Sequence, residues 1–136
     1  MDMLAHLRPV TTRKGIWLAT AEGFLEFRRA LLEEDWEDDS TRPGSIAISC
    51  AWHIFCRCNL HGIPPSNVVP SAKGGVGICF TRNGKYADFE CFNDGTVLWV
   101  ISDRHSDVDV LPLDPWHDAE VDNAVFRIAQ FLGYRK

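Results

Sequence analysis

The residues that most constrain the fold lie between positions 74 and 103, where three apolar-rich runs are separated by two turn signals. The first signal is Asn83-Gly84, and the second is Asn93-Asp94-Gly95. Both suit turns that need a positive φ angle, which glycine and asparagine tolerate. Short apolar runs joined by such turns predict a three-stranded antiparallel meander.

Alternation along the middle run, residues 85–92, assigns its side chains to two faces of the sheet. One set is apolar and is predicted to face the core; it consists of Ala87, Phe89 and Cys91. The other set mixes acids with aromatics; it consists of Tyr86, Asp88, Glu90 and Phe92. We therefore expect a sheet with one core face and a second face of different chemistry.

Helical periodicity flanks the meander on both sides. The first predicted helix runs from about residue 21 to 35 with Thr20 as its N-cap. The second runs from Ser45, its predicted cap, to about residue 60. The last runs from Asp118, its predicted cap, to the residue before Gly133.

The remaining segments complete an α+β fold. Residues 62–70 contain three prolines, which fix φ and push their predecessors to extended geometry. Residues 108–113 are predicted to form a short fourth strand that ends at Pro112 and Pro115. The expected architecture is two N-terminal helices, a three- to four-stranded antiparallel meander and a C-terminal helix packed on one sheet face. At 136 residues, the chain fits one domain, 1–136, with residues 1–19 as a loosely attached arm.

The composition limits the partners that the chain can have. The formal net charge of −5 argues against direct nucleic-acid binding, because that binding neutralises phosphates with Lys and Arg. No apolar run approaches the ~20 residues that cross a bilayer, and the N-terminus lacks the apolar stretch of a signal peptide. Five cysteines, an odd number, indicate reduced thiols used as small apolar side chains. We therefore expect a cytoplasmic protein with no membrane partner.

Several short motifs follow one another between residues 24 and 132. They are Trp36-Glu37-Asp38-Asp39-Ser40 with Pro43, then Val68, Pro70 and Gly74-Gly75-Val76-Gly77, then Tyr86-Ala87-Asp88-Phe89-Glu90 and Asn93-Asp94-Gly95. In these motifs the chain resembles a group of small bacterial α+β proteins of unknown function, often found in mobile-element or toxin–antitoxin-like gene neighbourhoods. The resemblance implies the fold and an antitoxin-like context, and it carries over no catalytic site. The chain departs from the group at Asp39, where glycine is common, and in its cysteine-rich second helix.

The second predicted helix concentrates possible metal ligands, namely Cys50, His53, Cys56, Cys58 and His61. Zinc is tetrahedral and prefers Cys and His, but ligands from one helix cannot surround an ion. No second element supplies a matching CxxC pair. We interpret the set as core cysteines with surface or capping histidines, and we predict no metal and no cofactor.

Asp88 and Glu90 lie two positions apart on one strand, so their carboxylates are expected on one face, about 7 Å apart. Carboxylate pairs at such a distance hydrolyse glycosidic bonds, which makes a small hydrolase one alternative. A solvated face, or ion pairs with Arg82 or Lys85, is another. Because Tyr86 and Phe92 flank the acids, and because aromatics anchor interfaces while acids select basic partners, we predict that these four residues bind a partner.

Residues 33–39 are the most acidic segment, with six acids and Trp36. Acids at the C-terminal end of a helix oppose its dipole, which favours a functional use over a structural one. We predict that Trp36, Asp38 and Asp39 contact a basic partner. A solvated loop and a divalent-metal site are the alternatives.

No catalytic set is predicted. Asp103, His105 and Ser106 have the side chains of a triad, but neighbours on one loop seldom converge as a triad must. Gly74-Gly75 precedes a strand rather than a helix, so it is not a phosphate loop.

The sequence therefore favours a non-enzymatic protein-binding module. We expect an inhibitor, antitoxin-like or anti-defence protein that occludes a partner protein with a basic surface. One alternative is a small hydrolase that uses Asp88 and Glu90. The other is a homo-oligomeric structural protein that pairs, for example as a homodimer, through the spare face of the second helix.

Overall fold

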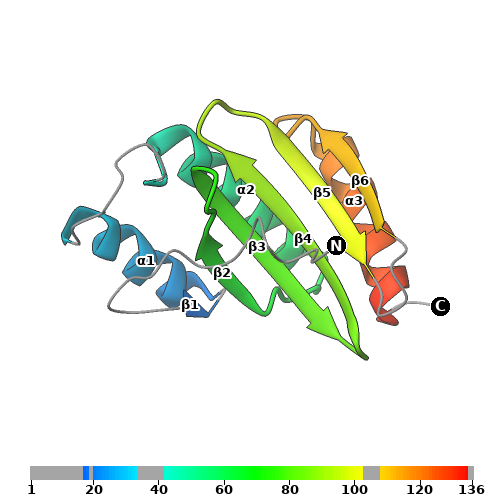
Figure 1. The fold of residues 1–136 in the computed structure, drawn as a ribbon. Coiled ribbons are helices and arrows are strands. Elements are labelled where there is room, and N and C mark those ends of the chain that lie inside the picture. Colours follow the sequence, from blue (N-terminus) through cyan, green and yellow to red (C-terminus); the bar gives the residue numbers. More distant parts are fainter. Residues whose placement is uncertain (1–16, 19, 34–41, 103–107, 135–136) are drawn as a thin grey trace.

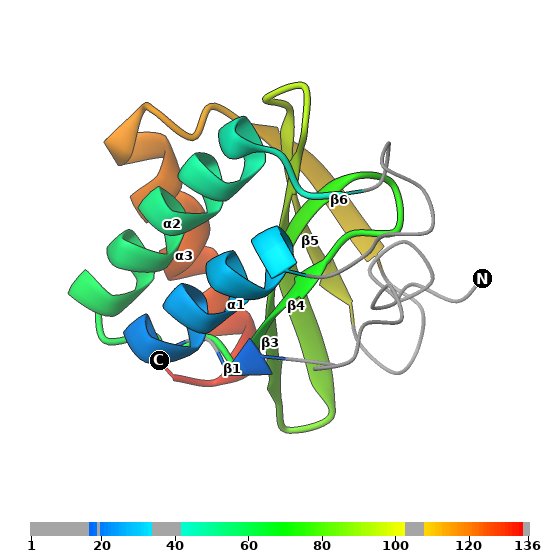
Figure 2. The same cartoon turned by 90° about the vertical axis from the view of Figure 1, so that its left-hand side faces the viewer.

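A computed structural model describes residues 17–18, 20–33, 42–102 and 108–134. It shows an α+β fold in which three helices lie on one side of an antiparallel sheet (Figures 1 and 2). In chain order the elements are β1 (Trp17–Leu18), α1 (Ala21–Glu33), α2 (Ser45–Leu60), β2 (Asn67–Pro70), β3 (Gly75–Arg82), β4 (Lys85–Phe92), β5 (Val97–Ser102), β6 (Val108–Leu113) and α3 (Asp118–Leu132).

Each strand of the sheet pairs with its neighbours in the sequence, in the order β1-β2-β3-β4-β5-β6. The predicted meander is confirmed as β3, β4 and β5, and its turns contain positive φ angles at Asn83 (55°), Gly84 (74°) and Gly95 (92°). The predicted strand count was too low, because β1 and β2 add to the sheet before the meander. β6 continues through Pro112, which the edge position allows, since an edge strand leaves one side of its backbone unpaired.

Glycine at position 75 is needed for the close approach of β3 and β4. Its φ is +144°, and a Cβ built there would lie 2.0 Å from the carbonyl oxygen of Cys91. A side chain cannot be accommodated at that distance from backbone, so the Gly74-Gly75 pair serves strand packing.

The helix boundaries agree closely with the sequence, but two of the caps do not. The amide of Gly23 donates to the Thr20 hydroxyl at 3.0 Å, which confirms that cap. The N-cap of α2 is Gly44 rather than Ser45, and the N-cap of α3 is His117 rather than Asp118. Asp118 is the first helical residue instead, and its carboxylate faces α2. None of the helices that the structure describes is long and apolar enough to cross a membrane.

The side chain of Asn93 joins the β4–β5 turn to the start of α2. Its Oδ1 accepts from the Gly44 amide at 2.7 Å, and its Nδ2 donates to the Arg42 carbonyl at 2.9 Å. These two bonds fix the backbone entry to α2 across a sequence separation of about 50 residues.

The hydrophobic core lies between the sheet and the helices. As predicted, Ala87, Phe89 and Cys91 point into it and are fully buried. The largest side chains that meet them come from all three helices and from β3; they are Phe24, Phe27, Ile54, Phe55, Ile128, Leu132, Ile78 and Phe80. The alternation along β4 therefore sets which face of the sheet the helices cover.

Candidate functional site

The opposite face of β4 is not the accessible surface that the sequence analysis expected. Asp88 is 0% exposed and Glu90 is 1% exposed, whereas Tyr86 and Phe92 are half-buried. The prediction that Asp88 and Glu90 form a solvated or partner-contacting face is therefore corrected. Alternation assigns a side chain to a face, but it does not show whether that face is open to water.

The two buried acids are held differently. The Ser71 hydroxyl donates to Oε1 of Glu90 at 2.7 Å, and the Lys73 amide donates to the Ser71 hydroxyl oxygen at 3.2 Å. Neither carboxylate oxygen of Asp88 has a hydrogen-bond partner in the described part of the chain. Burial raises the pKa of Asp88 to about 8, and the nearby Tyr86 hydroxyl opposes this shift only in part. Asp88 is therefore largely protonated at neutral pH.

Cys79 lies directly opposite Asp88 in the β3–β4 register, and its thiol accepts from the Tyr86 hydroxyl at 3.5 Å. Burial raises the pKa of Cys79 to about 12, so it is a neutral thiol. These side chains form a buried polar layer on this face of the sheet. In this arrangement no reacting group of Asp88 or Glu90 is reached from solvent.

The possible metal ligands of α2 separate into two groups. Cys50 and Cys58 are buried in the core, and Cys56 is the one exposed cysteine of the five. His53 and His61 point instead toward α3. Within the described residues, no three or more His, Cys, Asp or Glu side chains are placed to hold a metal ion.

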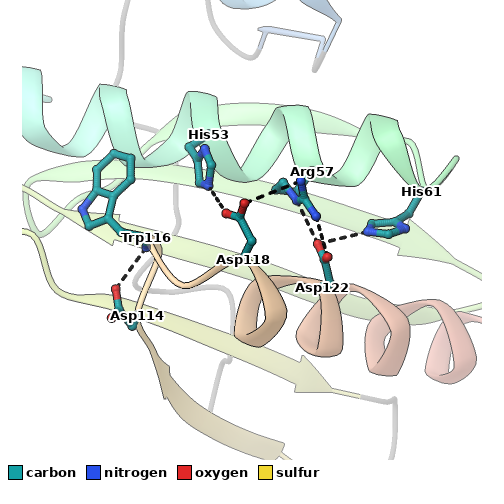
Figure 3. A network of polar contacts seen from close by, with 7 residues as sticks. All are labelled: His53, Arg57, His61, Asp114, Trp116, Asp118 and Asp122. Atoms are coloured by element: carbon teal, nitrogen blue, oxygen red, sulfur yellow. Dashed lines mark hydrogen bonds and ion pairs between the residues drawn. The ribbon is translucent and has the colours of Figure 1, made fainter.

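The histidines of α2 belong to a ladder of polar contacts between α2 and α3, which Figure 3 shows from close by. His53, Arg57 and His61 follow one another at four-residue spacing, which places them on one side of α2. Asp118 and Asp122 have the same spacing on α3. We name these five residues the α2–α3 ladder.

Arg57 occupies the centre of the ladder. Its Nε donates to Oδ1 of Asp122 at 2.9 Å, and its Nη1 lies 3.7 Å from Oδ2 of Asp118. His53 Nε2 lies 2.9 Å from Oδ1 of Asp118, and His61 Nε2 lies 3.0 Å from Oδ1 of Asp122. Hydrogen bonding from Arg57, and then from His61, holds the pKa of Asp122 below its usual range despite partial burial.

An aromatic side chain covers each end of the ladder. Trp116 packs against His53 with ring centroids 5.3 Å apart, and Phe126 packs against His61 at 4.8 Å. Trp116 is 60% exposed and Phe126 is 36% exposed. The backbone amide of Trp116 donates to Oδ1 of Asp114 at 3.0 Å, which fixes the turn that presents the indole (Figure 3).

An apolar stripe runs along α2 beside the ladder. Trp52, Cys56 and Leu60 are all exposed and follow one another at four-residue spacing. We use the name helical face for the ladder, the two end aromatics and this stripe. The face combines exposed tryptophan and leucine with a central arginine, which is the composition of many protein-binding surfaces.

The sequence analysis did not identify the helical face, although a signal was present. The spacing of His53, Arg57 and His61 and that of Asp118 and Asp122 match one another. Only packing of α2 on α3 brings the two sets together, across a sequence separation of 65 residues. The predicted contact residues Trp36, Asp38 and Asp39, and the set Asp103, His105 and Ser106, lie outside the described residues.

Comparisons with protein-family models, with curated proteins and with solved structures gave no match to this chain.

Proposed function

We propose that this chain is a non-enzymatic protein-binding module, an inhibitor or antitoxin-like protein that acts by occluding a partner protein. The observation that carries the proposal is the helical face, where Trp116 and Phe126 stand exposed at the two ends of the α2–α3 ladder. Aromatic residues and arginine dominate the binding energy of most protein interfaces.

The ladder ties the two helices of the helical face together. Arg57 contacts both acids of α3, and each histidine contacts one of them. The aromatic rings pack on these histidines, and we expect this packing to lower the entropy that they lose on binding. The neighbouring stripe supplies apolar area that water would leave on association.

The acidic segment remains part of the proposal. Trp36, Asp38 and Asp39 would select a partner with a basic surface, because opposite charges across an interface favour the encounter and exclude other partners. The helical face would then supply the anchors.

The proposal is tested by affinity capture from the native host with the full chain as bait. We expect one partner that is retained by the unchanged chain and lost when Trp116 and Phe126 are both replaced by alanine. Val110→Ser is the matched control, because Val110 is also an exposed apolar residue, 50% exposed, but lies on β6 outside the helical layer. Charge reversal at Asp38 and Asp39 should weaken capture of the same partner.

Two results would contradict this assignment. Capture that survives the double alanine variant excludes the helical face as the binding surface. Capture that is lost equally in Val110→Ser indicates a general loss of the folded chain instead of a loss of contacts.

The hydrolase alternative has one observation in its favour, which is the raised pKa of Asp88 beside Glu90. A hydrolytic activity that disappears in both Asp88→Asn and Glu90→Gln would support it over the binding module. The oligomer alternative predicts a dimer through α2 that dissociates in Leu60→Glu, as measured by light scattering.

A further inference from the structure

Two basic side chains of the β3–β4 hairpin lie over aromatic rings at the C-terminal end of α3. Cζ of Arg82 lies 3.9 Å from the ring centroid of Tyr134, and Nζ of Lys85 lies 5.0 Å from that of Phe131. Both distances suit cation–π contacts. The sequence left open that these cations pair with the acids of β4, whereas in the structure they contact the end of α3.

A third cation lies on α3 itself. Cζ of Arg127 lies 5.1 Å from the ring centroid of Trp99 on β5. Arg127 precedes Phe131 by four residues, so the two lie on one side of α3. The acids of α3, at positions 118, 120 and 122, all precede Arg127, so the second half of the helix is its basic half. We use the name basic end for Arg82, Lys85 and Arg127 with the rings beneath them.

Hydrogen bonds from two other groups attach the hairpin to α3. Nζ of Lys85 donates to the carbonyl oxygen of Phe131 at 3.0 Å, and Nδ2 of Asn83 donates to that of Leu132 at 3.1 Å. The last carbonyl groups of a helix have no partner within the helix, and these two bonds supply one. Lys85 therefore has a structural role at the basic end, and the two arginines are its candidate binding groups.

The arginines lie at the surface with their hydrogen-bond donors available. Arg82 and Arg127 are exposed, and within the described residues neither guanidinium group takes part in a hydrogen bond or an ion pair. Arg57, by contrast, contacts both acids of the α2–α3 ladder. The Tyr134 amide donates to the Ala129 carbonyl at 2.9 Å, which fixes the backbone that carries the ring beneath Arg82. A guanidinium group that lies over a ring keeps its in-plane N–H groups for an oxyanion.

We propose that the basic end binds an acidic segment of a partner protein, with one carboxylate on Arg82 and another on Arg127. Arginine forms paired hydrogen bonds with carboxylates, and opposite charges across an interface select the partner. Positions 127 and 134 are about 10 Å apart along the direction of α3, a length that about three residues of an extended peptide span. The segment therefore carries acids about three positions apart.

The aromatic rings favour a peptide over a single-stranded nucleic acid. Nucleic-acid strands stack their bases on aromatic side chains, but here a cation already lies over each ring, and Trp99 is buried. The net charge of −5 also opposes a polyanion more than a segment with few carboxylates. The inference does not depend on the proposed function, because it uses no residue of the helical face.

The test uses the full chain, labelled with ¹⁵N, and a capped hexapeptide with glutamate at its second and fifth positions and glycine and serine elsewhere. We expect this peptide to shift the amide signals of Arg82, Lys85, Arg127 and Tyr134. The matched peptide with glutamine in place of both glutamates should leave these signals unchanged. Because the contacts join exposed charges, the shifts should diminish as salt is added.

Two variants identify the groups that bind. Arg82→Gln and Arg127→Gln should each weaken binding of the glutamate peptide about threefold, the effect of one exposed charge contact. The double variant should weaken it about tenfold. Arg28→Gln is the matched control and should leave the affinity unchanged, because Arg28 is an exposed arginine of α1, on the other side of the molecule from α3 in Figure 1.

The proposal is overturned if the glutamine peptide shifts the same signals as strongly, or if Arg28→Gln weakens binding as much as Arg82→Gln. A single-stranded thymidine oligonucleotide with the same net charge as the glutamate peptide is the last probe. If it binds more tightly than that peptide, the partner is a nucleic acid, and the assignment to an acidic protein segment is wrong.

Discussion

The two faces of the sheet are both closed to water at their centre, yet they are built by different chemistry. On the helix side Phe89 and its neighbours are buried by apolar contacts. On the other side Asp88 and Glu90 are buried just as completely. Apolar side chains gain free energy when water leaves, whereas carboxylates lose it unless they are bonded or protonated. Adjacent residues of one strand therefore reach the same burial by different means, Phe89 by apolar contacts, Glu90 by its hydrogen bond from Ser71 and Asp88 by keeping its proton.

The largest effect is expected on the helix side. Phe89→Ala should lower the free energy of unfolding by about 3–5 kcal/mol, because it removes a fully buried ring and leaves a cavity. Urea denaturation of the purified chain measures the loss. Phe92→Ala is the control on the same strand, and its loss should be clearly smaller because Phe92 is only half-buried. Equal losses would show that the two faces do not differ as described.

The next prediction concerns Asp88, on the sheet face opposite the helices, and the direction in which it makes stability depend on pH. The pKa of Asp88 in the folded chain, about 8, is raised from an ordinary value of 3.8, so the folded state keeps a proton that the unfolded state loses. Its contribution to stability is therefore greatest below pH 4 and falls by up to about 1.4 kcal/mol per pH unit between pH 4 and pH 8.

Asp88→Asn removes this titration. As the pH rises from 4 to 8, we expect the free energy of unfolding of the variant to rise relative to that of the unchanged chain, by a few kcal/mol in total. The comparison of the two unfolding free energies at each pH cancels the titration of all other groups. A constant difference across this range would mean that Asp88 is ionised in the folded chain.

A smaller effect is expected in the ladder, which is polar but lies at the surface. Asp122→Asn should cost about 1–2 kcal/mol at pH 7, because Asp122 accepts charged hydrogen bonds from Arg57. The lowered pKa of Asp122 means that its contribution is present above pH 4 and is lost as the pH falls below it. The pH dependence of the Asp122 and Asp88 variants should thus have opposite signs, which denaturation at pH 3 and pH 8 would reveal.

The smallest change in the free energy of unfolding is expected at the edge of the sheet face that carries Asp88, where burial ends. Val110 of β6 follows Asp88 and Val100 in the same row of paired residues, but it is 50% exposed. Val110→Ser should change the free energy of unfolding by less than about 0.5 kcal/mol, as surface substitutions usually do. A loss of several kcal/mol would show that the closed region extends to the edge strand.

The sequence predicts the architecture well because its signals are local. The turns at Asn83 and Gly95, the helical periodicity of α3 and the cap at Thr20 depend on residues that are close together in the sequence, so spacing alone reveals them. β2 was predicted only as an extended segment because Pro70 at its end and Pro64-Pro65 before it weaken the strand signal, and the two-residue β1 is too short to give one.

The candidate site was predicted less well because it depends on contacts between distant residues. The position of Asp88 on the second face followed from alternation, but its burial did not. The pairing of Arg57 with Asp122 needs the packing of α2 on α3, which no spacing within either helix specifies.

The burial of the five cysteines allows unfolding of the chain to be followed by alkylation of its thiols. Only Cys56 is accessible to a thiol reagent in the native molecule, whereas four thiols are covered. The number of alkyl groups per chain, counted by mass spectrometry, should therefore rise from one to five as the structure opens. Cys91 lies in the core on the helix side of the sheet, and Cys79 faces the polar layer on the other side. The order in which the two thiols are alkylated would therefore show which face of the sheet opens first.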